Sequence, residues 1–175
     1  GQNVTGDNNT SMGINAGIGV KSSSNVSIGS DSGQNTDGLG NTAIGWQSGQ
    51  AVKGGQNISM GYQSAKGLKG SSNTVIGNQA GIDGVEGDNN IIVGTNATRL
   101  YTTGGSLKVQ NVVSLGTNSK AYTDNAVSIG SYSESTGKAA IAIGQSSKAS
   151  KDNSMAIGNG TLANTANGDV ALGSG

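Results

Sequence analysis

The side chains that could perform chemistry in this chain are hydroxyls, amides, carboxylates and amines. Serines are plentiful, but the sequence has no histidine to activate one and no cysteine to act as a thiolate. The same two absences exclude the common zinc sites, and no glycine-rich stretch ends in the GK[ST] of a phosphate-binding loop. The sequence therefore predicts no catalytic residue, no metal ion and no cofactor, and we expect a protein that is not an enzyme.

Recognition of a receptor is chemistry that these side chains can perform. Trp46 and Tyr62 each directly follow the glycine that closes a recurring phrase. We expect their rings to be neighbours, either as a contact surface for a glycan or a protein or as a ladder that only stabilises the fold. Three more residues, Arg99, Tyr101 and Lys108, lie in an interval where this phrase does not recur at its usual spacing. These five are the candidate receptor-binding residues.

The composition limits the kind of fold that can present these residues. Of 175 residues, 32 are glycine, none is proline or phenylalanine, and aromatic residues make up only 3%. A conventional core of large side chains is therefore excluded. Ten basic residues balance ten acidic ones, so the chain lacks the positive charge that binding to nucleic acid requires. No apolar run approaches the roughly 20 residues that cross a bilayer, and we expect no direct insertion into a membrane.

A short phrase recurs along the chain and predicts its architecture. The phrase consists of uncharged residues that end in a large aliphatic residue and glycine, as in NTAIG at 41–45 and VSIG at 127–130. Its eleven copies are mostly 16 residues apart in the first half and 14 apart in the second. That period accommodates two short strands and two tight turns, which is one rung of a β-solenoid. We predict an all-β fold, a parallel β-roll of 14–16-residue repeats, in which phrases such as DSG at 31–33 and QSSKA at 145–149 form the outer strands.

The absence of charge from the phrase predicts that both faces of its strand are covered. The last residue before each marker glycine is always Met, Ile, Val or Leu. We expect this aliphatic residue to fill the narrow interior of the roll, opposite Ser or Ala of the outer strand. The other face needs a partner that one thin solenoid cannot supply, so the chain is expected to self-associate. The residues assigned to the core or to packing between copies are Met12, Ile28, Ile44, Met60, Ile76, Val93, Leu115, Ile129, Ile143, Ile157 and Leu172.

Side chains at equivalent positions of successive rungs are expected to stack along the solenoid. Asn25, Asn41, Asn57 and Asn73 align in this way, and we interpret them as a ladder that stabilises turns. All charged residues, Lys148 among them, fall outside the three residues that precede a marker glycine. They are predicted to lie on the solvent side of the roll.

One interval breaks the period and divides the chain. The 22-residue step from Gly94 to Gly116 contains TRLYTTGGSLKVQNV at 98–112. We predict TRLY and LKVQ as the two short strands of a protruding hairpin, and the alternative is a plain loop that joins two classes of repeat. The predicted organisation is a β-roll with 16-residue repeats over 1–94, an insertion or hairpin over 95–115, and a β-roll with 14-residue repeats over 116–175.

The units VSIGSYSESTGKAA, IAIGQSSKASKDNS and MAIGNGTLANTANGD, which close on VALGSG, resemble the head repeats of YadA-type trimeric autotransporter adhesins. The resemblance implies a left-handed parallel β-roll assembled as a homotrimer and exposed at the bacterial cell surface, with an outer-membrane anchor outside this sequence. It also implies a role in virulence through multivalent binding of host extracellular-matrix, serum or other host proteins. The NTAIG…AG repeats of residues 9–94 also resemble those of some phage tail fibres, so a receptor-binding segment of a tail fibre is the alternative function.

Overall fold

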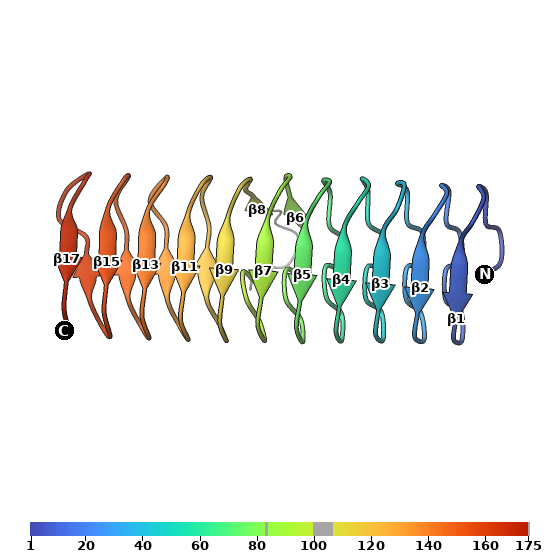
Figure 1. Ribbon diagram of the computed structural model, residues 1–175, viewed down its shortest axis with the longest axis horizontal. Helices are drawn as coiled ribbons and strands as arrows, with labels where there is room; N and C mark the ends of the chain where they lie inside the picture. The colour runs from blue at the N-terminus through green and yellow to red at the C-terminus, as the bar shows by residue number, and fades with distance from the viewer. Residues whose placement is uncertain (83, 100–106, 175) are drawn as a thin grey trace.

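The computed structural model is a rod of stacked rungs, in which the chain advances steadily from one end to the other (Figure 1). It describes residues 1–82, 84–99 and 107–174, and within these residues every regular element is a β-strand. The recurring phrases form one 11-stranded sheet along the rod, and each strand pairs in parallel with its equivalent in the next rung. The predicted all-β parallel solenoid is confirmed.

The main sheet takes one three-residue strand from each rung, and each strand ends directly before a marker glycine. Pairing is in register, so that Ile129 lies between Leu115 and Ile143. Equivalent side chains therefore stack in ladders along the rod, and each face repeats one kind of residue. The strands are β1 (Thr10–Met12), β2 (Val26–Ile28), β3 (Thr42–Ile44), β4 (Ile58–Met60), β5 (Thr74–Ile76), β7 (Ile91–Val93), β9 (Val113–Leu115), β11 (Val127–Ile129), β13 (Ile141–Ile143), β15 (Met155–Ile157) and β17 (Val170–Leu172).

The opposite side of the rod carries a second parallel sheet in the C-terminal half of the chain. Its four two-residue strands fall in the phrases that the sequence predicts as outer strands. Those outer strands are thus confirmed in this half. They are β10 (Lys120–Ala121), β12 (Glu134–Ser135), β14 (Lys148–Ala149) and β16 (Leu162–Ala163).

In the N-terminal half, the predicted outer strands are wrong. DSG at 31–33 and its equivalents form turns, because Asp31 (φ 55°) and Gly33 (φ 60°) adopt the left-handed conformation and bend the chain twice. The second side is held there by single parallel bridges that join Asp37 to Lys53 and Lys53 to Lys69. One short pair, β6 (Val85–Glu86) with β8 (Leu107–Lys108), completes it.

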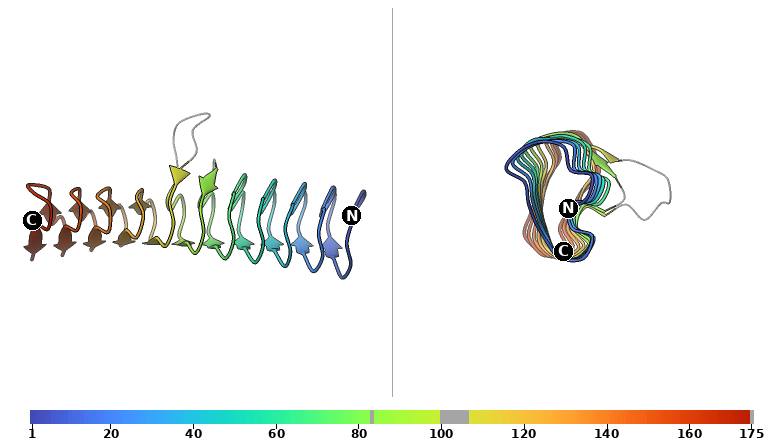
Figure 2. Two further views of the ribbon diagram at one scale, coloured as in Figure 1. Left: turned by 90° about the horizontal axis from the view of Figure 1, so that it is seen from above. Right: turned by 90° about the vertical axis from the view of Figure 1, so that its right-hand side faces the viewer.

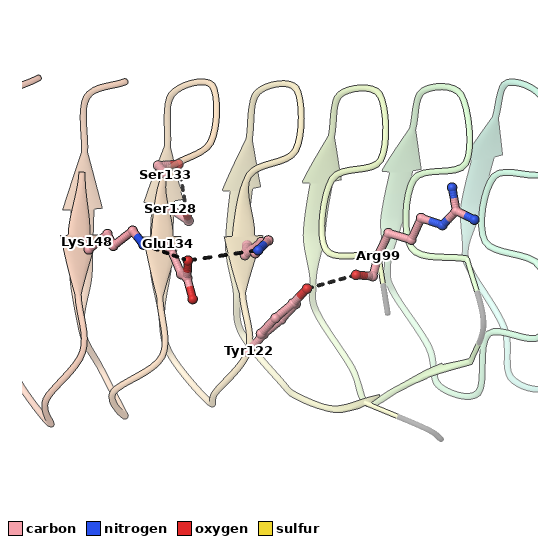
Figure 3. Close-up of polar contacts among 7 residues, drawn as sticks. Arg99, Tyr122, Ser128, Ser133, Glu134 and Lys148 are labelled. Carbon is pink, nitrogen blue, oxygen red and sulfur yellow. Dashed lines mark hydrogen bonds and ion pairs between the residues drawn. The ribbon is translucent and has the colours of Figure 1, made fainter. Parts of the chain in front are cut away.

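The interior of the rod is filled by the middle residue of each main strand, which corrects the predicted facing. Ser128 and Ala142 are fully buried, whereas their neighbours Ile129 and Ile143 are only half-buried. The aliphatic residues before the marker glycines therefore point outward and not into the roll. The reason is space, since the interior of this rung is so narrow that the hydroxyl of Ser128 on β11 meets that of Ser133, the residue directly before β12, at 2.8 Å (Figure 3).

Apolar burial is uneven along the rod. The middle of the chain has a core with larger side chains, including Leu68, Val75 and Ile92. A buried methylene group contributes about 0.8 kcal/mol, so rungs that bury only alanine gain little from the hydrophobic effect. The stability of the C-terminal rungs must therefore come mainly from the hydrogen bonds between rungs. Their buried core consists of Ala140, Ala142, Ala149, Ala156 and Ala163.

The interval that breaks the period returns to the solenoid before β9. The predicted second strand, LKVQ, contains β8, which pairs in parallel with β6 of the preceding rung. Val109 and Val112 are buried in the core. In the predicted first strand, Thr98 is buried in a turn with φ 44°, and positions 100–101 lie outside the described residues. Figure 2 shows β6 and β8 at one edge of the stacked rungs.

The asparagine ladder is confirmed. In each step from Asn25 to Asn73, the side-chain Oδ1 accepts a hydrogen bond from the backbone N–H of the next asparagine, at 2.8 to 3.0 Å. Asn90 extends the series at 2.9 Å. These amides are buried and satisfy turn backbone groups that would otherwise lack a partner, so their role is structural.

Candidate functional site

The outward-facing residues of the main sheet form a surface that runs the length of the rod, which we name the apolar flank. It comprises the first and third residues of every main strand, and all are aliphatic or methionine except Thr10, Thr42 and Thr74. Met12 at one end and Leu172 at the other expose 62% and 69% of their surface. All eleven residues that the sequence assigns to core or trimer packing lie on this one surface. A continuous apolar surface of this kind is rare on a soluble monomer, which makes the apolar flank a candidate interaction surface.

Trp46 and Tyr62 form an aromatic pair beside the flank. Each follows the marker glycine at the end of its strand, β3 or β4. Their ring centroids are 4.9 Å apart and the ring planes are inclined by 37°. The two residues expose 42% and 40% of their surface, so the pair that the repeat spacing predicts is present and open to solvent.

A ladder of glutamine side chains lies next to the aromatic pair, at the following position of each rung. Gln63 Nε2 donates to Gln47 Oε1 at 2.9 Å, and Gln79 Nε2 donates to Gln63 Oε1 at 3.0 Å. Arg99 completes the series, because its guanidinium donates to Gln79 Oε1 at 2.5 Å and to Asn96 Oδ1 at 3.1 Å. We name this series, from Arg99 to Gln47, the amide ladder.

Arg99 is therefore placed by the structure close to the polar surroundings of the aromatic pair. It is half-buried, and its backbone carbonyl accepts a hydrogen bond from the hydroxyl of Tyr122 at 2.8 Å (Figure 3). The sequence ladder Gln47, Gln63 and Gln79 shows the same 16-residue spacing as the aromatic residues, so the repeat period could have revealed it.

Lys108 is not brought to this site. Lys108 lies on β8, in the short sheet with β6, and is exposed. It borders an open hollow of about 420 Å³ whose other lining residues include Glu86, Val109 and Asp124. Tyr101 lies outside the described residues.

The outer sheet of the C-terminal half presents a charged surface. Glu134 on β12 lies between two lysines of the neighbouring strands, with Oε2 3.9 Å from Lys120 Nζ and 3.8 Å from Lys148 Nζ (Figure 3). All three side chains are partly exposed. The predicted outward placement of these charges is confirmed.

Replacement of Glu134 by glutamine is expected to leave the fold intact. Solvent-exposed ion pairs of this kind contribute about 0–1 kcal/mol, which corresponds to a change in Tm of less than about 4 °C for a chain of this size. Differential scanning calorimetry of Glu134→Gln measures the change. A much larger fall in Tm would show that these charges support the fold.

The described residues include no group of three or more His, Cys, Asp or Glu side chains placed to hold a metal ion. No helix with the length and hydropathy of a membrane span occurs among them. The candidate functional features are therefore surfaces: the apolar flank, the aromatic pair with its amide ladder, and the charged outer sheet.

Comparison with known proteins agrees with this architecture. Residues 113–133 and 135–161 match the family model of the YadA head domain repeat, in two copies. The rod is similar to the crystal structure of the collagen-binding domain of the Yersinia adhesin YadA, with a TM-score of 0.53 and 22% sequence identity, over 80% of this chain and 69% of that one. No curated protein sequence gives a significant match. The C-terminal half thus contains YadA head repeats, and the chain has the fold of a YadA-like head domain, as the sequence resemblance predicts.

Proposed function

We propose that this chain is the head of a bacterial cell-surface adhesin, which assembles as a homotrimer and binds host extracellular-matrix or serum proteins. The observation that carries the proposal is the coincidence of YadA head repeats at 113–161 with an uncovered apolar flank on the same rungs. The family match falls on the 14-residue repeats, and it supports an adhesin over a phage tail fibre.

Assembly follows from the energetics of the rod. The C-terminal rungs bury only small side chains inside, while the larger Ile, Val, Leu and Met side chains lie outside. Burial of an exposed Ile or Leu side chain contributes about 1.5–3 kcal/mol. Part of this contribution, from up to two apolar positions per rung along the rod, supplies a large driving force when the flank packs against other copies of the chain.

Adhesion requires no catalytic group and no deep pocket, and the rod has the properties that it does require. Its surface ladders repeat along one axis, and three copies side by side would present each ladder three times. Weak contacts then add into tight binding, because the second and third contacts form at a high effective concentration. The similar Yersinia domain is described as collagen-binding, and collagen is therefore the first ligand to test.

The test combines sedimentation with binding to purified matrix proteins. Analytical ultracentrifugation of the chain is expected to give the mass of three copies. Surface plasmon resonance against immobilised collagen, fibronectin and laminin is expected to show saturable binding to at least one of them, with loss of apparent affinity in Ile143→Asp if the trimer is needed for avidity. A well-ordered single chain in solution, or a trimer that binds none of these proteins or serum proteins, would contradict the proposal.

A further inference from the structure

The fold does not require an aromatic residue at either position of the aromatic pair. The same position, directly after the marker glycine, holds Ser30 in the preceding rung and Asn78 in the following one. In the C-terminal rungs it holds Thr, Ser, Gln or Asn. A small or polar residue therefore satisfies the turn, and two large exposed rings in adjacent rungs call for a different explanation. In a chain with only 3% aromatic residues, a ligand that packs on the rings supplies one.

The amide ladder has a fixed direction, and this direction places a hydrogen-bond donor beside Trp46. The guanidinium of Arg99 can only donate, so the oxygen and not the nitrogen of the Gln79 side chain must face it. The nitrogen of Gln79 then faces Gln63, and the nitrogen of Gln63 faces the oxygen of Gln47. The ladder ends there, and Gln47 Nε2 donates no hydrogen bond to another described residue. The donor at its open end belongs to the residue that follows Trp46.

The surroundings of the pair are almost free of charge. Besides the rings, the two positions after the marker glycines of these rungs hold amides or hydroxyls, with Asp31 as the single ionised side chain. Its carboxylate already accepts hydrogen bonds from Asn15 at 3.0 Å and Gln34 at 2.9 Å. The site therefore offers apolar ring faces and neutral hydrogen-bonding groups, and no cluster of charge that would select an ionic ligand.

We infer that Trp46, Tyr62 and Gln47 form a binding site for a neutral glycan. The apolar C–H face of a sugar ring packs on an exposed aromatic ring, and a sugar hydroxyl accepts a hydrogen bond from Gln47 Nε2. The two rings lie in line with the rod axis, so an oligosaccharide that lies along the rod contacts both. The inference rests on the proposed function as an adhesin and names a class of receptor for it, the carbohydrate of a host surface.

Trp46 is the only tryptophan in the chain, so its fluorescence reports this site directly. The protein is titrated with neutral chito-, malto-, cello- and β-galacto-oligosaccharides, and with heparin oligosaccharides as the charged comparison. At least one neutral sugar is expected to shift the emission of Trp46 in a saturable way. In Tyr62→Asn, which installs the residue of the next rung, the affinity for that sugar is expected to fall about tenfold. Isothermal calorimetry extends the comparison to Trp46→Ser.

Tyr132→Asn is the matched control, because Tyr132 is an exposed aromatic residue in a distant rung and its removal is expected to leave sugar binding unchanged. The inference is wrong if no neutral sugar shifts the emission, if only heparin does, or if Tyr62→Asn binds as tightly as the wild type. It is also wrong if the emission responds to dilution and not to sugar, since Trp46 would then lie in a contact between copies. Binding of the wild type, Tyr62→Asn and Trp46→Ser to matrix proteins, measured in parallel, separates a failure of the glycan site from a failure of the proposed adhesin function.

Discussion

Ile143→Asp is expected to abolish self-association while leaving the rod folded. Ile143 points outward on the apolar flank, between Ile129 and Ile157 of the adjacent rungs. In a single rod, the new carboxylate remains in water. In the proposed trimer it would be sealed against another copy without a partner, and an unpaired buried charge is far too costly for the interface to tolerate. Sedimentation is expected to change from the mass of three chains to that of one, with the β-sheet circular dichroism retained.

Ala142→Asp is the control in the adjacent residue. Ala142 is completely buried on the inner face of the same strand, so a charge there meets the interior of the roll and not a neighbouring copy. This variant is expected to lose more than about 4 kcal/mol of folding free energy and to fail to fold. An Ile143→Asp variant that remains trimeric, or an Ala142→Asp variant that folds, would show that the two faces are assigned the wrong way round.

Gly130→Ala is expected to destabilise the rod itself by about 3 kcal/mol or more. Gly130 closes β11 with φ 127°, a conformation that L-residues rarely adopt. An added Cβ would lie 2.6 Å from the carbonyl carbon and oxygen of Gly144 in the next rung. The backbone of that rung must shift to make room, and overpacking of this kind costs about 1–3 kcal/mol beyond the conformational strain. Calorimetry is expected to show a Tm lower by roughly 10 °C.

Gly168→Ala separates the conformational cost from the clash. Gly168 also has a positive φ, 74°, but no atom lies within 4 Å of the position that its Cβ would occupy. Its replacement is expected to cost only about 1 kcal/mol, from the left-handed backbone alone. Equal losses in the two variants would mean that the close stacking of successive rungs does not determine the need for glycine.

The stacked side chains of this fold are predictable from the sequence. Which face of each strand points into the roll is not. In-register parallel stacking converts a repeated residue at a fixed spacing into a contact, so the asparagine ladder and the Trp46–Tyr62 pair follow from the period alone. Alternation shows that Val127 and Ile129 share a face and that Ser128 lies on the other. It does not show which face is inside. The width of the interior decides this, and in the C-terminal rungs it admits only small side chains and reverses the usual placement of large apolar residues.

The candidate site likewise contains contacts that the repeat period predicts and contacts that it does not. Gln47, Gln63 and Gln79 repeat with the period, and their contacts could be read from it. Arg99 joins them from a turn 20 residues beyond Gln79, through the reach of a long side chain that no period describes. Lys108 lies on β8, which pairs in parallel with β6 of the preceding rung. The number of residues in the interval does not specify where the chain rejoins the stack of rungs.

The bonds that join the rungs lie along the rod, as in the pairs Gly130 N–H to Leu115 O at 2.8 Å and Val127 N–H to Ala140 O at 2.9 Å. A pull on the two ends therefore stretches these bonds lengthwise, with every junction in series under the same tension. The mechanical strength of one rod is that of its weakest junction, and it does not grow as more rungs are added. Three rods packed side by side would share the load at each junction. Packing rods together would therefore raise the force that the assembly withstands, whereas additional rungs would increase only its length.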